Sequence, residues 1–186
     1  MKKLNLLLAM VLFGFVANAQ EVKFPPVDAS PADIAYFPGN ISQLKKGDDT
    51  APLIKVVYSR PSVKGRVVLG ELEAFGKVWR LGANESTEIR FFKPATIGGK
   101  TIPAGTYSMF AIPEKDQWTI IINKQTDRWG AYTYDESKDV ARIKVPVKQL
   151  TTAVEALAIT FTASASGANL NIGWDKTAVE VPITIK

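Results

Sequence analysis

The residues of this sequence that could bind a ligand are concentrated between Tyr58 and Glu88. Arginines and glycines are interleaved through this stretch, in the order Arg60, Gly65, Arg66, Gly70, Gly76, Arg80 and Gly82. Glycine lets a backbone approach closely or take a positive φ, and a guanidinium group offers a planar fork for carboxylate, phosphate or sulfate. The pattern predicts either an anion-binding concavity or structural salt bridges to the acidic residues of the same stretch, and both alternatives stay open.

A non-catalytic binding site is the first hypothesis. Its arginines would hold a small anionic or polyhydroxylated, carbohydrate-like ligand, an indole would provide an apolar stacking face, and amide and carboxylate groups would orient the ligand. The predicted ligand-binding residues are Arg60, Arg66, Trp79, Arg80, Asn84, Glu85 and Trp129. Trp129 falls between predicted strands, where a loop tryptophan either contacts a ligand or covers the end of the domain.

A carboxylate-dependent hydrolase is the second hypothesis. General acid–base catalysis needs two carboxylates in different surroundings, and Glu85 with Glu88 or Asp127 are the available candidates. Residues three apart on a strand face opposite sides, so Glu85 and Glu88 cooperate only if residues 84–86 form a loop. We therefore assign no catalytic residue and favour binding over enzymatic activity, with a structural or protein-interaction domain as a further alternative.

Composition excludes several kinds of chemistry. The chain has no His and no Cys, which excludes a Ser-His-Asp triad, a cysteine nucleophile and a zinc site of the Cys/His kind. The acidic pairs Asp48-Asp49 and Asp135-Glu136 do not have the spacing of a calcium-binding loop. The sequence predicts neither a metal site nor a cofactor.

The first 19 residues have the pattern of a secretory signal peptide. Lys2-Lys3 precedes an apolar run from Leu4 to Val16, and Ala17-Asn18-Ala19 gives a small-x-small cleavage pattern. The run is shorter than the roughly 20 apolar residues that cross a bilayer. We expect cleavage after Ala19, export to the periplasm or the medium, and no membrane span in the mature protein.

The net charge of the chain limits the partners that can be expected. Without Lys2-Lys3 the net charge falls from +5 to +3, which is too small a surplus to predict a nucleic-acid partner, and no protein partner is identified.

Residues 20–50 are rich in proline and predict an irregular leader, which apolar side chains attach to the domain. Residues 51–186 alternate apolar and polar side chains between frequent turn residues. They predict an all-β domain, a single antiparallel β-sandwich with jelly-roll or immunoglobulin-like layers.

Four motifs carry a resemblance to a known family. They are 58–66 (Tyr-Ser-Arg-Pro-Ser-Val-Lys-Gly-Arg), 76–85 (Gly-Lys-Val-Trp-Arg-Leu-Gly-Ala-Asn-Glu), 103–108 (Pro-Ala-Gly-Thr-Tyr-Ser) and 129–132 (Trp-Gly-Ala-Tyr). With them, the chain resembles the bacterial family called domain of unknown function 2911 over about residues 50 to 186. The resemblance implies an exported, β-rich envelope protein with no established reaction, and it transfers no catalytic residue. Leu81 stands where that family often has Thr, so no hydroxyl is expected there.

Overall fold

The computed structural model describes residues 21–39, 41 and 45–185. The predicted signal peptide, residues 1–19, lies outside the described residues and stays a prediction. Within the residues that the structure describes, no helix is long and apolar enough to cross a membrane.

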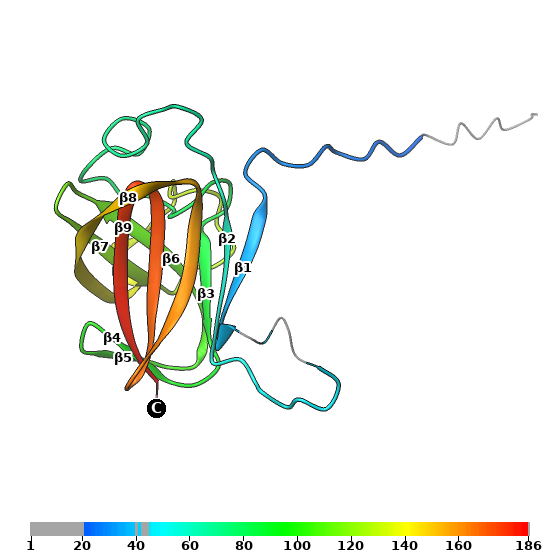
Figure 1. Cartoon of the computed structure of the whole chain (residues 1–186), viewed down its shortest axis with the longest axis vertical. Coiled ribbons are helices and arrows are strands. Elements are labelled where there is room, and N and C mark those ends of the chain that lie inside the picture. Colours follow the sequence, from blue (N-terminus) through cyan, green and yellow to red (C-terminus); the bar gives the residue numbers. More distant parts are fainter. Residues whose placement is uncertain (1–20, 40, 42–44, 186) are drawn as a thin grey trace, which may run out of the picture.

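In the described part of the chain, nine antiparallel strands form the domain (Figure 1). They are β1 (Ala32–Phe37), β2 (Ile54–Ser59), β3 (Thr87–Phe91), β4 (Ala95–Ile97), β5 (Lys100–Ile102), β6 (Gly105–Pro113), β7 (Gln117–Asn123), β8 (Asp139–Ser164) and β9 (Gly167–Ile185). The predicted all-β antiparallel class is confirmed. The Gly98-Gly99 turn joins β4 to β5 as expected, because both glycines have positive φ values, 57° and 77°.

The strands form one continuous sheet in the order β1-β2-β3-β6-β7-β8-β9-β4-β5. The long β8 makes the sheet fold over itself, because its first part, to Pro146, pairs with β7 and its later part, from Val147, pairs with β9. Register shifts follow Gln149 and Val154, where irregular pairing allows a strand to bend. The two layers of the predicted sandwich are therefore parts of a single sheet.

Hydrogen bonds from the end of β2 to β8 join the two layers of the folded sheet along one side. The Tyr58 hydroxyl donates to the carbonyl of Ile159 at 3.4 Å and accepts from the Ile159 N–H at 3.0 Å. Just beyond β2, the Val63 N–H donates to Glu155 O at 2.8 Å, and Leu157 N–H donates to Pro61 O at 2.9 Å. These hydrogen bonds fix residues 60–63 against β8.

One hydrophobic core lies inside the folded sheet, and tryptophans occupy much of it. Trp118 and Trp174, which alternation placed in the core, are 0% exposed. The Trp79 ring stacks on Trp174 with centroids 5.5 Å apart and meets Trp118 edge-on at 5.8 Å. This arrangement combines large burial with favourable ring geometry.

The leader differs from the irregular segment that its prolines predict. Ala32–Phe37 forms β1 and pairs with all of β2, with Ala32 opposite Ser59 and Phe37 opposite Ile54. Phe37 also packs against Phe161 of β8. Residues 21–27 are extended and run outward from the body of the domain (Figure 1), whereas Asp28 and Pro31 contact it through hydrogen bonds. The last part of the leader therefore belongs to the sheet, because its prolines lie outside the paired residues.

We predict that Tyr58→Phe destabilises the domain by about 1–3 kcal/mol, because the variant leaves the buried Ile159 N–H without its acceptor. Urea denaturation measures the change in unfolding free energy. Tyr132→Phe is the matched control, since Tyr132 is 81% exposed and should tolerate the loss of its hydroxyl. Equal stability of the two variants would show that Tyr58 does not hold the layers together.

Candidate functional site

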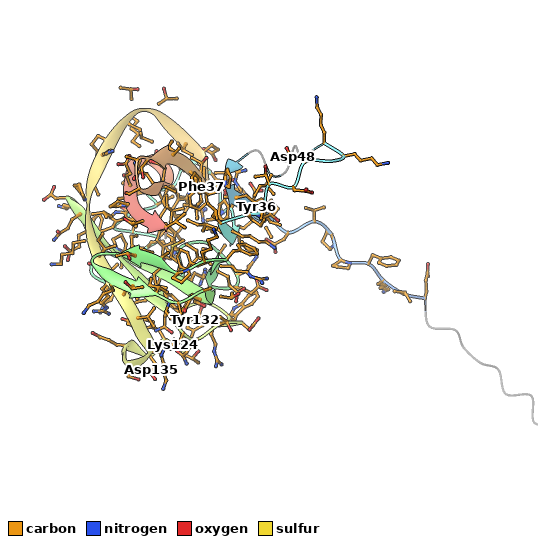
Figure 2. All side chains as sticks on the ribbon, turned by 90° about the horizontal axis from the view of Figure 1, so that it is seen from below. Tyr36, Phe37, Asp48, Lys124, Tyr132 and Asp135 are labelled. Atoms are coloured by element: carbon orange, nitrogen blue, oxygen red, sulfur yellow. The ribbon has the colours of Figure 1, made fainter. Side chains whose placement is uncertain are left out.

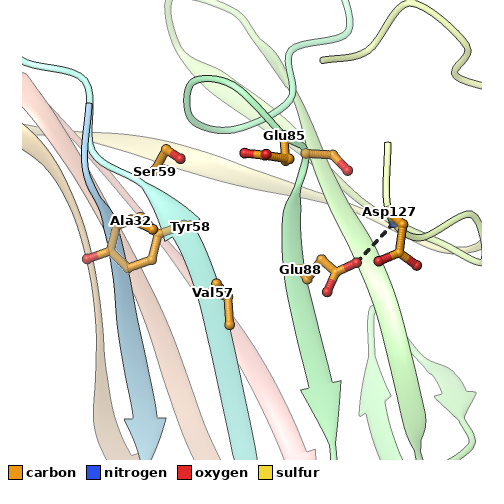
Figure 3. Close-up of a pocket in the computed structure, with 8 residues that line it drawn as sticks. Ala32, Val57, Tyr58, Ser59, Glu85, Glu88 and Asp127 are labelled. Atoms are coloured by element: carbon orange, nitrogen blue, oxygen red, sulfur yellow. Dashed lines mark hydrogen bonds between the residues drawn. The ribbon is translucent and has the colours of Figure 1, made fainter. Parts of the chain in front are cut away.

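Two adjacent hollows lie on the face of β2 and β3 that points away from the core, and Figure 3 shows the inner one. The inner hollow, about 190 Å³, is lined by Ala32, Val57, Tyr58, Ser59, Glu85, Ser86, Glu88 and Asp127. The outer hollow, about 300 Å³, is lined by Asp28, Ser30, Ala32, Ser59, Asn84, Glu85 and Trp129. The three residues common to both, Ala32, Ser59 and Glu85, make the hollows one connected site.

Strand register places the floor of the inner hollow. Val57 of β2 is opposite Glu88 of β3, and Glu88 is opposite Ser108 of β6. Their neighbours Val56 and Ile89 point into the core, so Val57 and Glu88 point outward, as alternation along a strand requires. The floor therefore consists of outward-facing strand residues, held in place by the sheet.

A sharp turn before β3 presents Asn84 and Glu85 to the site. Leu81 and Asn84 have φ values of 55° and 59°, a conformation that asparagine tolerates and leucine rarely adopts. The turn is held from inside, because the Thr87 hydroxyl donates to Leu81 O at 2.7 Å and the Trp79 indole N–H donates to Gly82 O at 3.1 Å. Buried groups therefore fix a conformation that an isolated chain would seldom populate.

The loop after β7 is attached to this turn by main-chain hydrogen bonds. Gly130 N–H donates to Asn84 O at 2.9 Å, and Ser86 N–H donates to Arg128 O at 2.8 Å. This pairing puts Trp129 beside Glu85 on the outer hollow, with 61% of Trp129 exposed. Figure 3 shows Asp127 from the same loop facing Glu88, whose Oε1 accepts the Asp127 N–H at 3.1 Å.

The leader supplies the remaining wall of the outer hollow. Asn84 Nδ2 donates to Asp28 Oδ1 at 3.1 Å, and the same oxygen accepts the Ser30 N–H at 2.6 Å. Further along, Arg60 N–H donates to Pro31 O at 3.0 Å. The contacts of Asp28 and Pro31 fix this part of the leader at the rim of the site.

The site offers carboxylates, an amide, a hydroxyl and an exposed indole. Because residues 84–86 precede β3, Glu85 and Glu88 line the same hollow, which meets the condition set for their cooperation by the sequence. Within the described part of the chain, no group of three or more acidic residues has a geometry that could hold a metal ion. The arrangement is suited to accepting hydrogen bonds from hydroxyl or ammonium groups.

Three of the seven predicted ligand-binding residues come together in the outer hollow: Asn84, Glu85 and Trp129. Trp79 does not, because it is 2% exposed and belongs to the core, so it cannot supply the expected stacking face. Its indole instead supports the turn that carries Asn84 and Glu85.

The arginines do not form the expected concavity, and none of them lines either hollow. Arg60 forms an ion pair with Asp33 at 2.8 Å and donates from Nε to Leu157 O at 2.9 Å. Arg66 donates to the carbonyls of Ser62 and Val63 at 2.6 and 3.0 Å. Both guanidinium groups therefore have structural roles, but neither forms the expected salt bridge to an acidic residue of the 58–88 stretch within the described residues.

Arg80 is half-buried near Glu73 and beside the backbone of Gly130. Its Nε is buried and forms no hydrogen bond within the described residues. Burial raises the pKa of Glu73 to about 7, although the positive charge of Arg80 acts in the opposite direction. Arg80 is therefore partly buried beside the loop after β7 and lines neither hollow.

Sequence reasoning missed Asp28, Ser30 and Ser59. Ser59 alternates with buried Tyr58, which indicates an outward position, but nothing local shows that other segments will cover it. Asp28 and Ser30 lie in the leader, and their place at the site depends on the pairing of β1 with β2.

We predict that Glu73→Gln stabilises the protein at pH 8 but has little effect near pH 4.5. Folding raises the pKa of the Glu73 carboxyl from its ordinary value of 4.5 to about 7, so ionised Glu73 destabilises the folded state. The stability of the protein therefore falls as the pH rises from 4.5 to about 7, and the full loss remains at higher pH. Melting temperatures at the two pH values measure the effect, with exposed Glu71→Gln as the control. A change that is the same at both pH values would contradict the prediction.

Comparison with known proteins gives a family for this chain. Residues 42–183 match the model of the family described as "Protein of unknown function (DUF2911)". Neither the curated proteins nor the solved structures with which the chain was compared include a match. The match covers the turn before β3, the loop after β7 and all strands from β2 onward, so the resemblance seen in the sequence is confirmed and the chain belongs to the DUF2911 family.

Proposed function

We propose that this protein is a binding module for an uncharged or positively charged polyhydroxylated ligand, such as one end of an oligosaccharide, in the two adjacent hollows. The observation that carries the proposal is the exposed indole of Trp129 beside the polar side chains of Asn84, Asp28 and Glu85. An indole packs against the C–H face of a sugar ring, while amide and carboxylate oxygens accept hydrogen bonds from its hydroxyls.

The size of the site fits a small ligand or the end of a longer one. The outer hollow of about 300 Å³ is at the lower end of the roughly 300–1,000 Å³ range of ligand pockets. Its walls come from the leader, the turn before β3 and the loop after β7, all fixed by hydrogen bonds. A site that is already formed loses little conformational entropy when a ligand binds.

The charge of the site narrows the ligand class that the sequence suggested. Glu85, Glu88 and Asp127 line the inner hollow, whereas Arg60 and Arg66 bind protein groups elsewhere. A negatively charged ligand would be repelled by these carboxylates. Of the two expected ligand classes, we therefore retain the polyhydroxylated one.

Export of the protein is part of the proposal. It rests on the signal-peptide pattern of residues 1–19. A periplasmic or secreted protein of this kind would meet envelope or environmental polysaccharides.

We predict that Trp129→Ala lowers the affinity for a neutral trisaccharide by about tenfold, equivalent to about 1.4 kcal/mol. Calorimetry with a panel of cellotriose, maltotriose and mannotriose measures the affinity of the purified protein. Tyr132→Ala is the matched control, because Tyr132 is also a highly exposed aromatic residue on the same loop but lines neither hollow (Figure 2).

Two results would contradict this function. The first is that no trisaccharide of the panel and no positively charged sugar binds, which would favour the structural or protein-interaction alternative. The second is that Trp129→Ala and Tyr132→Ala change affinity equally. Chromatography of the same mixtures for shorter products detects turnover and so identifies the hydrolase alternative.

A further inference from the structure

We propose that the inner hollow is a subsite for an ammonium group, so that the ligand is an amino sugar with a free amine. The inference rests on the proposed function, because the sugar ring would occupy the outer hollow against Trp129. Ser59 and Glu85 line both hollows, and a single molecule can therefore contact both.

Negative charge is concentrated at the inner hollow. Glu85, Glu88 and Asp127 are three of its eight lining residues, and the other five carry no positive charge. None of the three forms an ion pair with another described residue. The chain as a whole has a net charge of +5, so overall charge gives no general attraction for a cation and a preference for one must arise locally.

The carboxylate oxygens are only partly used by the protein. Glu88 Oε1 accepts the Asp127 N–H at 3.1 Å, and Asp127 Oδ2 accepts the Thr126 hydroxyl at 2.9 Å. The second oxygen of each carboxylate, and both oxygens of Glu85, form no hydrogen bond within the described residues. These oxygens are available to a ligand donor.

Positive groups next to the site are engaged with aromatic rings. Lys55 and Arg90 line a neighbouring hollow together with Glu88. The Lys55 ammonium lies 5.9 Å from the ring centre of Tyr36, and the Arg90 guanidinium lies 4.6 Å from that of Phe92. Lys55 and Arg90 reduce the negative potential at Glu88 without forming an ion pair with its carboxylate. Glu85 and Asp127 line the inner hollow, which neither of these two positive residues lines.

Ser59 gives an independent indication of a polar ligand. Its residue is only 7% exposed, it lines both hollows, and its hydroxyl forms no hydrogen bond with any described residue. The Ser59 hydroxyl is not fully enclosed by protein, so it can exchange a hydrogen bond with a ligand or solvent group in the hollow. Figure 3 shows Ser59 on the β2 side of the hollow, across from the carboxylates of β3 and the loop after β7.

An ammonium group matches this set of acceptors. It has three donors and no acceptor, and the inner hollow offers one neutral oxygen from Ser59 and carboxylate oxygens from separate segments. A hydrogen bond to a carboxylate is charge-assisted whether an ammonium or a hydroxyl group donates it, but the ammonium group adds the Coulomb attraction between opposite charges. A neutral hydroxyl at the same position of the sugar would gain less.

The test compares two ligands that differ only at the C2 substituents. The β-1,4-linked trimer of glucosamine carries ammonium groups at pH 6, and cellotriose carries hydroxyls in their place. Calorimetry of the purified protein is expected to show about tenfold tighter binding of the glucosamine trimer. Its N-acetylated form, which has no positive charge, should lose this advantage.

Two variants connect the preference to the inner hollow. Glu88→Gln and Asp127→Asn remove one charge each, and asparagine tolerates the positive φ of 57° at position 127. Each should reduce the advantage of the glucosamine trimer to about threefold or less, because the affinity for the charged trimer falls more than the affinity for cellotriose. Glu71→Gln, which removes an exposed carboxylate elsewhere, should change neither, and melting curves verify that each variant is folded.

The outcomes separate this inference from the proposed function. Equal affinity for the two trimers, or tighter binding of any neutral trisaccharide, overturns the ammonium subsite and leaves sugar binding intact. A preference for the glucosamine trimer that survives in both Glu88→Gln and Asp127→Asn also overturns it. If neither the glucosamine trimer nor any neutral sugar binds, the proposed function itself fails.

Discussion

Two main-chain hydrogen bonds determine the geometry of the candidate site. They join Gly130 to Asn84 and Ser86 to Arg128, at 2.9 and 2.8 Å, and thus hold the loop after β7 against the turn before β3. Because the contacts are between backbone groups, the position of Trp129 does not depend on burying its ring. The same constraint brings Asp127 opposite Glu88 and gives the inner hollow its third carboxylate.

The arginines and the glutamates of residues 58–88 have different roles. Arg60 and Arg66 satisfy carbonyl groups where the chain leaves β2, and Arg60 also neutralises Asp33 of β1. Glu85 and Glu88, by contrast, have no ion-pair partner in the described chain and face the hollow. A chain with a net positive charge therefore presents a locally acidic hollow, so the local potential differs in sign from the overall charge.

Core and site are connected through the turn that precedes β3. Trp79 packs against two other tryptophans, and its indole N–H fixes Gly82 O, while Thr87 fixes Leu81 O. A Cβ at position 82 would lie 3.0 Å from Ser59 O, so a glycine permits the turn to approach β2 closely. The turn therefore has little freedom to move, and the fold itself holds in place the polar groups that follow it.

Alternation and turn chemistry by themselves determined the all-β antiparallel class, the Gly98-Gly99 hairpin, and the core positions of Trp118 and Trp174, because these depend on neighbours close in sequence. Only the tertiary structure decided that Trp79 is buried and Trp129 exposed, since neither belongs to a strand with a readable period. Long-range pairing also placed β1 in the sheet and Asp28 at the site. Such contacts depend on strand register and loop closure across the whole domain, and no local pattern of residue types specifies them.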